Sequence, residues 1–127
     1  MDKNPALYEN YINDLKAYLK EENEVRLVAR QLLQMHSEIS SRESPTVLEL
    51  GVDRGQSTKV FLNAIDNKPL ANLISVDIRD CSNVSGSNLW TFIKMDSSNI
   101  EGIIEAAPIL KKGIDVLYID SLHTPEH

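Results

Sequence analysis

A short apolar segment that ends at a glycine and precedes a helical pattern sets the strongest limit on the fold of this chain. Residues 46–50 read Thr-Val-Leu-Glu-Leu, Gly51 follows, and apolar side chains then recur at helical spacing to about residue 65. A short apolar run of this kind is typical of a strand buried on both faces of a parallel sheet. The segment therefore predicts a strand, a tight turn and a helix that is capped by Ser57.

The same alternation continues along the rest of the sequence. Three more strands are predicted at residues 72–77, 90–95 and 115–119, and a helix with Ser98 and Glu101 at capping-box spacing lies before the last of them. The polar, Ser-rich segment from residue 78 to residue 89 predicts a loop rather than a helix. Strands that alternate with helices pair in parallel through right-handed crossovers, so we expect an α/β fold.

Residues 1–43 predict a helical extension ahead of the sheet-forming part, residues 44–127. Asn4 is suited to cap a helix whose first residue is Pro5, and a second helical pattern follows from about Asn23. The aromatic side chains of this extension recur at helical spacing, which is typical of packing between helices rather than of a ligand site.

The composition narrows the classes of function. Nineteen acidic against 13 basic side chains give a net charge of −6, which disfavours a nucleic-acid partner. The sequence has neither the apolar run of about 20 residues that spans a bilayer nor a signal-peptide core in its first residues. The single cysteine, Cys81, excludes an internal disulfide and a Cys-rich zinc site. We therefore expect a cytoplasmic domain that handles a small molecule, with no membrane or nucleic-acid partner.

Polar residues follow each predicted strand at its carboxyl end. Gly51 follows the first strand, Asp77 ends the second, Asp96 and Ser97 follow the third, and Asp120 follows the fourth. The carboxyl ends of parallel strands meet at one edge of the sheet, where open α/β sheets bind their ligands. This convergence predicts a binding site, although each residue taken alone is also compatible with a turn or a cap.

The glycine loop before the second predicted helix suits an anionic group, because helix N-termini present N–H groups. It is not a dinucleotide fingerprint, since Asp53 stands where the second glycine would be, and no Gly-Lys-Ser/Thr follows as in a P-loop. Gly55 permits the close approach of a ligand or of a neighbouring element. Asp77 is placed to accept both hydroxyls of a ribose.

Two motifs make the chain resemble class I S-adenosylmethionine-dependent methyltransferases. The branch of small-molecule O-methyltransferases and cephalosporin-hydroxylase-like proteins carries E-I-G-x-x-x-G-x-S, which residues 49–57 match, and I-D-G-x-H-x-x-E, which residues 119–126 match in part. The resemblance covers about two thirds of the chain. It implies a Rossmann-like parallel sheet in the order 3-2-1-4.

The resemblance also implies the roles of residues around the glycine loop. Gly51, Gly55 and Ser57 would cradle the methionine part of S-adenosylmethionine, and Glu49 would support its amino group. These four residues are cofactor-binding residues by resemblance alone.

The later strand ends receive roles in the same way. Asp77 would hold the ribose hydroxyls, and Asp96 with Ser97 would lie beside the adenine amino group. Asp120 would face the methionine end or bind a divalent metal such as Mg²⁺. His123 would be the general base that takes a proton from a substrate hydroxyl, so His123 and Asp120 are the expected catalytic residues.

The match has two departures. Ser121 and Leu122 replace the glycine and the polar residue that often follow the aspartate, which weakens the case for a metal. The family fold continues for three more strands, so we expect a chain truncated after its fourth strand that holds the cofactor-binding portion. An unpaired fourth strand would be an aggregation liability, so we also expect its edge to be covered by the N-terminal helices or by a second copy in a dimer.

These observations predict an S-adenosylmethionine-dependent methyltransferase that acts on a small-molecule hydroxyl. The alternative is a non-catalytic S-adenosylmethionine-binding or assembly module on the same scaffold. Nucleotide-sugar or dinucleotide binding is disfavoured by the glycine spacing.

Overall fold

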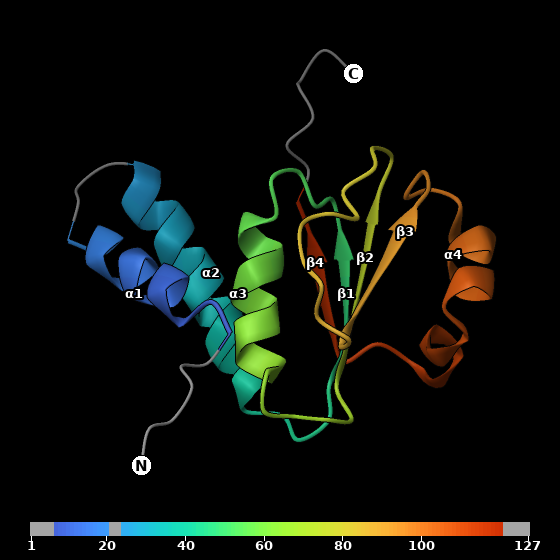
Figure 1. The fold of residues 1–127 in the computed structure, drawn as a ribbon, viewed down its shortest axis with the longest axis horizontal. Coiled ribbons are helices and arrows are strands. Elements are labelled where there is room, and N and C mark those ends of the chain that lie inside the picture. Colours follow the sequence, from blue (N-terminus) through green and yellow to red (C-terminus); the bar gives the residue numbers. More distant parts are fainter. Residues whose placement is uncertain (1–6, 21–23, 121–127) are drawn as a thin grey trace.

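The computed structural model describes residues 7–20 and 24–120, which form a four-stranded sheet with helices on both faces (Figure 1). The elements follow in the order α1 (Glu9–Tyr18), α2 (Glu24–Ser40), β1 (Thr46–Leu50), α3 (Gln56–Ile65), β2 (Asn72–Asp77), β3 (Trp90–Lys94), α4 (Ile100–Ala106), the 3₁₀ helix η1 (Pro108–Lys112) and β4 (Val116–Ile119).

All three strand pairs are parallel, and the strand order is β3-β2-β1-β4. Leu48 of β1 lies opposite Ile74 of β2 on one side and Leu117 of β4 on the other. The predicted α/β, Rossmann-like sheet in the order 3-2-1-4 is therefore confirmed. The predicted loop between β2 and β3 is also confirmed, since residues 78–89 contain no helix.

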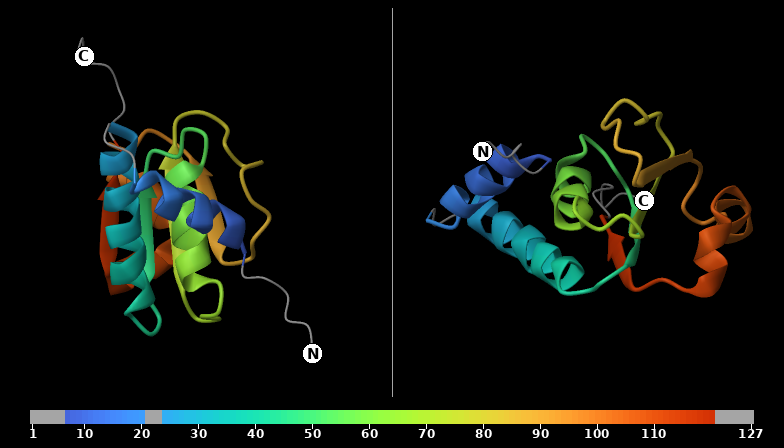
Figure 2. Two further views of the ribbon diagram at one scale, coloured as in Figure 1. Left: turned by 90° about the vertical axis from the view of Figure 1, so that its left-hand side faces the viewer. Right: turned by 60° about the horizontal axis from the view of Figure 1, so that its bottom comes forward.

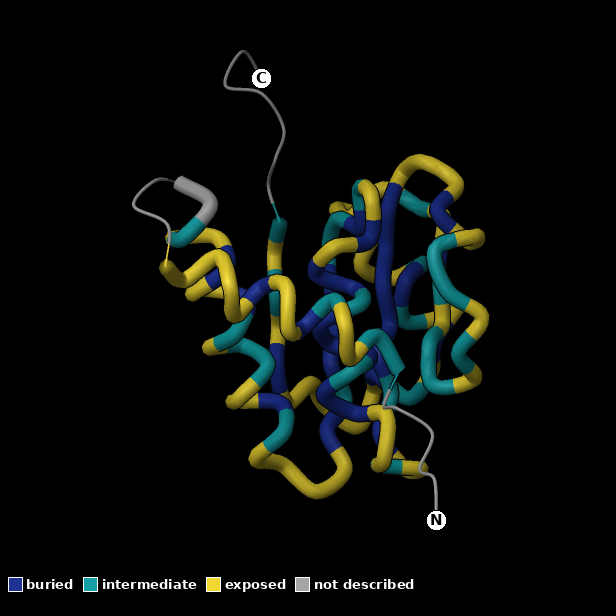
Figure 3. The backbone as a smooth tube through the Cα atoms, turned by 60° about the vertical axis from the view of Figure 1, so that its left-hand side comes forward, coloured by how far each residue is buried: buried dark blue, intermediate teal, exposed yellow. Residues whose placement is uncertain are grey.

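The two faces of the sheet bury separate apolar clusters. On one face α1, α2 and α3 pack around fully buried side chains such as Phe61, Ile39 and Leu73. On the other face α4 and η1 contribute Ile103 and Leu110 to a smaller cluster. Figure 2 shows this layering from two further directions. Figure 3 shows the buried residues gathered in the interior of the molecule, and they belong mainly to β1, β2 and α3.

Two helix starts differ from the sequence predictions. Gly55, and not Ser57, is the N-cap of α3, because the Ser57 hydroxyl turns inward to a buried carboxylate. The N-cap of α4 is Asn99, whose side chain accepts from the Gly102 N–H, so Ser98 is displaced by one position. The first helix begins at Glu9. The predicted cap at residues 4–5 lies outside the described residues.

The outer edge of β4 has no strand partner within the described ranges. Helices α1 and α2 pack against each other and against α3, on the face of the sheet that buries Val116. Leu117 and Ile119 face the other way and are 50% and 58% exposed. Within residues 7–20 and 24–120, no helix has the length and apolar character that crossing a membrane requires.

Candidate functional site

A cavity of about 620 Å³ lies at the carboxyl edge of the sheet. All four strands contribute to its wall, either with their last residues or with the residues that follow them. The wall consists of Leu50, Gly51, Asp53, Val76, Asp77, Ile78, Arg79, Met95, Asp96, Ser97, Ile119 and Asp120. This volume falls within the range of about 300–1,000 Å³ that is usual for small-molecule sites.

The cavity brings together five of the residues singled out in the sequence, namely Gly51, Asp77, Asp96, Ser97 and Asp120. Glu49, Gly55 and Ser57 are buried and lie outside its wall. His123 lies outside the described residues. The roles expected for all of these residues toward a cofactor or substrate stay predictions.

Glycine is required at two positions of the loop because of both its backbone angles and its neighbours. Gly51 has φ +102°, and a Cβ there would lie 2.6 Å from the carbonyl oxygen of Asp120. Gly55 has φ +85°, and a Cβ there would overlap the Val84 side chain. Both φ values fall where residues with a Cβ are strained. Gly51 thus allows the ends of β1 and β4 to meet, and Gly55 allows the loop after β2 to approach.

Asp77 joins the end of β2 to the glycine loop. Its Oδ2 accepts hydrogen bonds from the backbone N–H groups of Val52 and Asp53, at 2.8 and 3.1 Å, and its Oδ1 accepts from the N–H of Arg79 at 2.9 Å. Burial raises the pKa of Asp77, but these three donors and the Arg79 guanidinium outweigh burial and hold the pKa below its ordinary value. Asp77 is therefore an ionised acceptor at the cavity wall.

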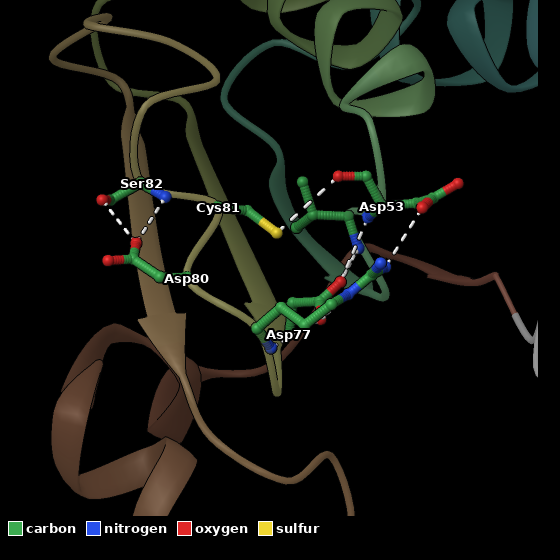
Figure 4. A network of polar contacts seen from close by, with 7 residues as sticks. Asp53, Asp77, Asp80, Cys81 and Ser82 are labelled. Carbon is green, nitrogen blue, oxygen red and sulfur yellow. Dashed lines mark hydrogen bonds and ion pairs between the residues drawn. The ribbon is translucent and has the colours of Figure 1, made fainter.

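Arg79 and Asp53 form an ion pair at the mouth of the cavity. The Arg79 guanidinium lies 3.1 Å from Asp53 Oδ1 and 3.6 Å from Asp77 Oδ1. Figure 4 shows Asp53, Asp77 and Cys81 gathered at this point, with the Cys81 thiol directed at the Asp53 carbonyl oxygen, 3.7 Å away. Asp53 itself adopts φ +53°, so the turn is shaped at a non-glycine residue as well.

Asp96 closes the cavity on the β3 side with a local turn. Its Oδ1 accepts from the Ser98 N–H at 2.9 Å and from the Ser98 hydroxyl at 2.8 Å. The backbone hydrogen bond from Ser98, followed by the hydroxyl, lowers the pKa of Asp96. Asp80 and Ser82 repeat the same arrangement in the loop after β2, which is also drawn in Figure 4.

Beneath the loop, Glu49 is a completely buried carboxylate. Thr58 and Ser75 donate their hydroxyl protons to its Oε1, each at 2.7 Å, and Ser57 donates to its Oε2. The indole N–H of Trp90 donates to Ser75 Oγ at 2.8 Å. Burial raises the pKa of Glu49 despite the three hydroxyl donors, and the charge of Asp120 adds to the increase.

The contributions of Arg79, Ser75 and Trp90 were not predicted from the sequence. Arg79 stands two residues beyond the end of β2, a position that the predicted strand places at the ligand edge, so its location was accessible from sequence. Ser75 and Trp90 looked like ordinary strand residues, and only the lateral pairing of β2 with β3 brings them together.

A metal site is not supported by the part of the chain that the structure describes. Within it no three His, Cys, Asp or Glu side chains come together in a group that could hold a metal ion. Asp120 alone does not match the six to eight oxygen ligands that hard divalent cations take or the octahedral set that Mg²⁺ prefers.

Comparison with known proteins gives one family. No curated protein matches this chain. The family model described as "Methyltransferase domain" matches residues 48–127, from β1 through all of the strand ends that line the cavity. The chain belongs to this family of methyltransferase domains.

Proposed function

We propose that the cavity binds S-adenosylmethionine and that the chain serves as a methyltransferase toward a small-molecule hydroxyl. One observation carries the proposal: residues from all four strand ends of a domain in the methyltransferase family meet in one cavity. The positions that the two sequence motifs single out, Gly51 and Asp120, lie in direct proximity there.

The chemistry of the wall favours an elongated ligand that carries both hydroxyls and positive charge. Four aspartates and one arginine line the cavity, together with apolar residues such as Leu50, Val76 and Ile119. Carboxylates favour a cationic sulfonium, because opposite charges attract strongly where water is partly excluded. Apolar surface between the carboxylates suits a flat aromatic ring system such as adenine.

The orientation of the ligand follows from the order of the strands. Asp77 at the end of β2 would accept the ribose hydroxyls, and Asp96 with Ser97 after β3 would lie beside the adenine amino group. Gly51 and Asp120 at the ends of β1 and β4 would then face the methionine end. Asp77 already accepts three backbone N–H groups, so its carboxylate would be held in place before the ribose arrives.

When bound, S-adenosylmethionine supplies an electrophilic methyl group on its sulfonium. The residues of this chain would contribute mainly orientation, since methyl transfer to an oxygen is an in-line displacement that depends on alignment. Asp120 would bear negative charge near the sulfonium. His123 would take the proton from the acceptor hydroxyl, in keeping with an imidazole that titrates near neutral pH.

Calorimetric titration of the 127-residue chain with S-adenosylmethionine tests the proposal. We expect saturable binding at about one site per chain, and methyl transfer to a hydroxyl compound such as catechol when it is supplied as acceptor. Binding without transfer to a panel of hydroxyl acceptors would favour the non-catalytic module. A folded chain that does not bind S-adenosylmethionine would contradict the proposal.

A further inference from the structure

We propose that Glu49 is a positioning residue, which holds the glycine loop and the first turn of α3 from beneath the cavity without touching the ligand. Its effect on cofactor affinity rests on the proposed function, whereas its effect on the loop does not. The role differs from the one that the family resemblance implies, which is direct support of the cofactor's amino group.

The position of Glu49 separates it from the cavity. It is a residue of β1 with no exposed surface, and it is not part of the cavity wall. Its two oxygens accept three hydroxyl protons, from Ser57 and Thr58 on α3 and from Ser75 on β2. A carboxylate whose oxygens already accept hydrogen bonds inside the protein can hold the side chains that donate those bonds in fixed positions.

Two of the hydroxyl donors to Glu49 lie on the residues that follow the glycine loop. Ser57 and Thr58 are the second and third residues of α3, which begins directly after the loop of residues 51–55. The N-cap Gly55 makes no side-chain capping bond, and the first turn of α3 has no acidic residue. Glu49 therefore supplies from β1 the hydrogen-bond acceptors that hold the first turn of α3. Glu49 thereby connects the two ends of the loop, because it stands two residues before the loop begins and bonds to Ser57 and Thr58 just after the loop ends.

The network has a defined direction. The indole N–H of Trp90 donates to Ser75 Oγ at 2.8 Å, and the single hydroxyl proton of Ser75 is donated to Glu49. Hydrogen bonds thus run from β3 through β2 to β1, and from α3 to β1. Since β1, β2 and β3 all end at the cavity, the network fixes three walls of the site relative to one another.

Three substitutions distinguish positioning from ligand contact. Glu49→Gln keeps an acceptor for Thr58 and Ser75, and its amide can donate to a rotated Ser57 hydroxyl, but it removes the ionisable carboxyl group. Glu49→Leu removes all acceptors, and Thr58→Val removes one donor at nearly constant shape. Ile39→Val, in the fully buried part of α2, is the control for a general loss of stability.

Hydrogen exchange of the ligand-free chain measures the loop directly. We expect the amides of residues 51–59 to exchange at least tenfold faster in Glu49→Leu and at least threefold faster in Thr58→Val than in the Ile39→Val control. Glu49→Gln should stay within threefold of the wild-type chain. If the loop amides of Thr58→Val and Glu49→Leu exchange no faster than those of the Ile39→Val control, the proposal is overturned. If Glu49→Leu does not fold, Thr58→Val decides alone.

Titration with S-adenosylmethionine then separates the two roles of Glu49. Positioning predicts that Glu49→Gln keeps its Kd within threefold, while Thr58→Val weakens binding at least threefold. A tenfold loss of affinity in Glu49→Gln with unchanged loop exchange would mean that the carboxyl group itself contacts the ligand, which overturns the proposal. If the wild-type chain does not bind S-adenosylmethionine, the proposed function fails, and the exchange data still decide the role of Glu49.

Discussion

The pKa values of Asp77 and Glu49, two carboxyl groups beside the same glycine loop, shift in opposite directions. The reason is the kind of hydrogen-bond donor that each group meets. Asp77 accepts three backbone N–H groups and lies beside a guanidinium, which together outweigh its burial and lower its pKa. Glu49 accepts only hydroxyls and is fully enclosed, so burial dominates and raises its pKa. Residue type alone does not separate these cases.

Asp77→Asn is expected to destabilise the chain by about 1–3 kcal/mol, because the amide cannot accept all the backbone N–H groups that Asp77 satisfies. The lowered pKa of Asp77 adds a pH dependence. Because Asp77 has its ordinary pKa of 3.8 in the unfolded chain and a lower pKa in the folded chain, the unfolded chain binds the proton more readily. The stabilisation by Asp77 is therefore present above pH 3.8 and is lost as the pH falls through the pKa of the folded chain.

Urea unfolding between pH 7 and pH 2.5 checks this prediction. The stability difference between the wild-type chain and Asp77→Asn should shrink as the pH falls, because the wild-type carboxyl becomes neutral. A difference that stays constant across this range would show that Asp77 is not an ionised acceptor in the folded chain.

At the scale of elements, the link between β1 and α3 depends on contact with the loop after β2. Val84 in that loop packs onto Gly55, and the Tyr8 hydroxyl donates to Ser85 Oγ at 2.9 Å, so the N-terminal part also holds the loop. A segment without regular structure is thereby fixed by contacts on two sides. The N-terminal helices thus help to shape the surroundings of the cavity through this loop.

Gly55→Ala is expected to destabilise the chain by about 2–4 kcal/mol, since it combines positive-φ strain with overlap of the new methyl group on Val84. Gly86→Ala is the matched control, because a Cβ at that position meets nothing within 4 Å. Thermal unfolding of both variants measures the difference. The double variant Gly55→Ala/Val84→Ala should recover part of the loss. Equal stability of the two single variants would contradict the packing argument.

At the scale of the whole molecule, the edge strand β4 has no strand partner on its outer side among residues 7–20 and 24–120, and it carries two exposed apolar side chains. Leu117 and Ile119 lie side by side with Leu48 and Leu50 of β1 in the sheet register, yet both are about half exposed. An edge strand with exposed apolar side chains is a template for pairing with another chain. We propose that two copies of this chain associate through β4.

Sedimentation velocity over a range of micromolar concentrations tests this association. We expect a dimer in the wild-type chain and a monomer in Leu117→Lys/Ile119→Lys. Leu70→Lys is the control, since Leu70 is 76% exposed in the turn before β2, at the opposite end of the sheet from the cavity. A wild-type chain that stays monomeric, with fast hydrogen exchange at residues 116–119, would contradict the proposal.

Much of the fold was determined by the sequence alone. The apolar run before Gly51 and the later strand segments specified a parallel sheet, because strand and helix patterns have distinct periods that local residues display. The strand ends at Asp77, Asp96 and Asp120 followed from the same pattern. They predicted the edge at which the cavity lies, since the carboxyl ends of parallel strands share one edge.

Only the tertiary structure decided which of these residues face the cavity and which lie beneath it. Glu49 and Ser57 belong to the same motif as Gly51, but the packing of α3 buries Ser57 against Glu49, and the pairing of β1 with β2 places Ser75 against Glu49 as well. The cap of α3 moved to Gly55 for the same reason, because a buried carboxylate competes for the Ser57 hydroxyl. Such choices depend on groups far apart in sequence, and local pattern carries no information about which of them will meet.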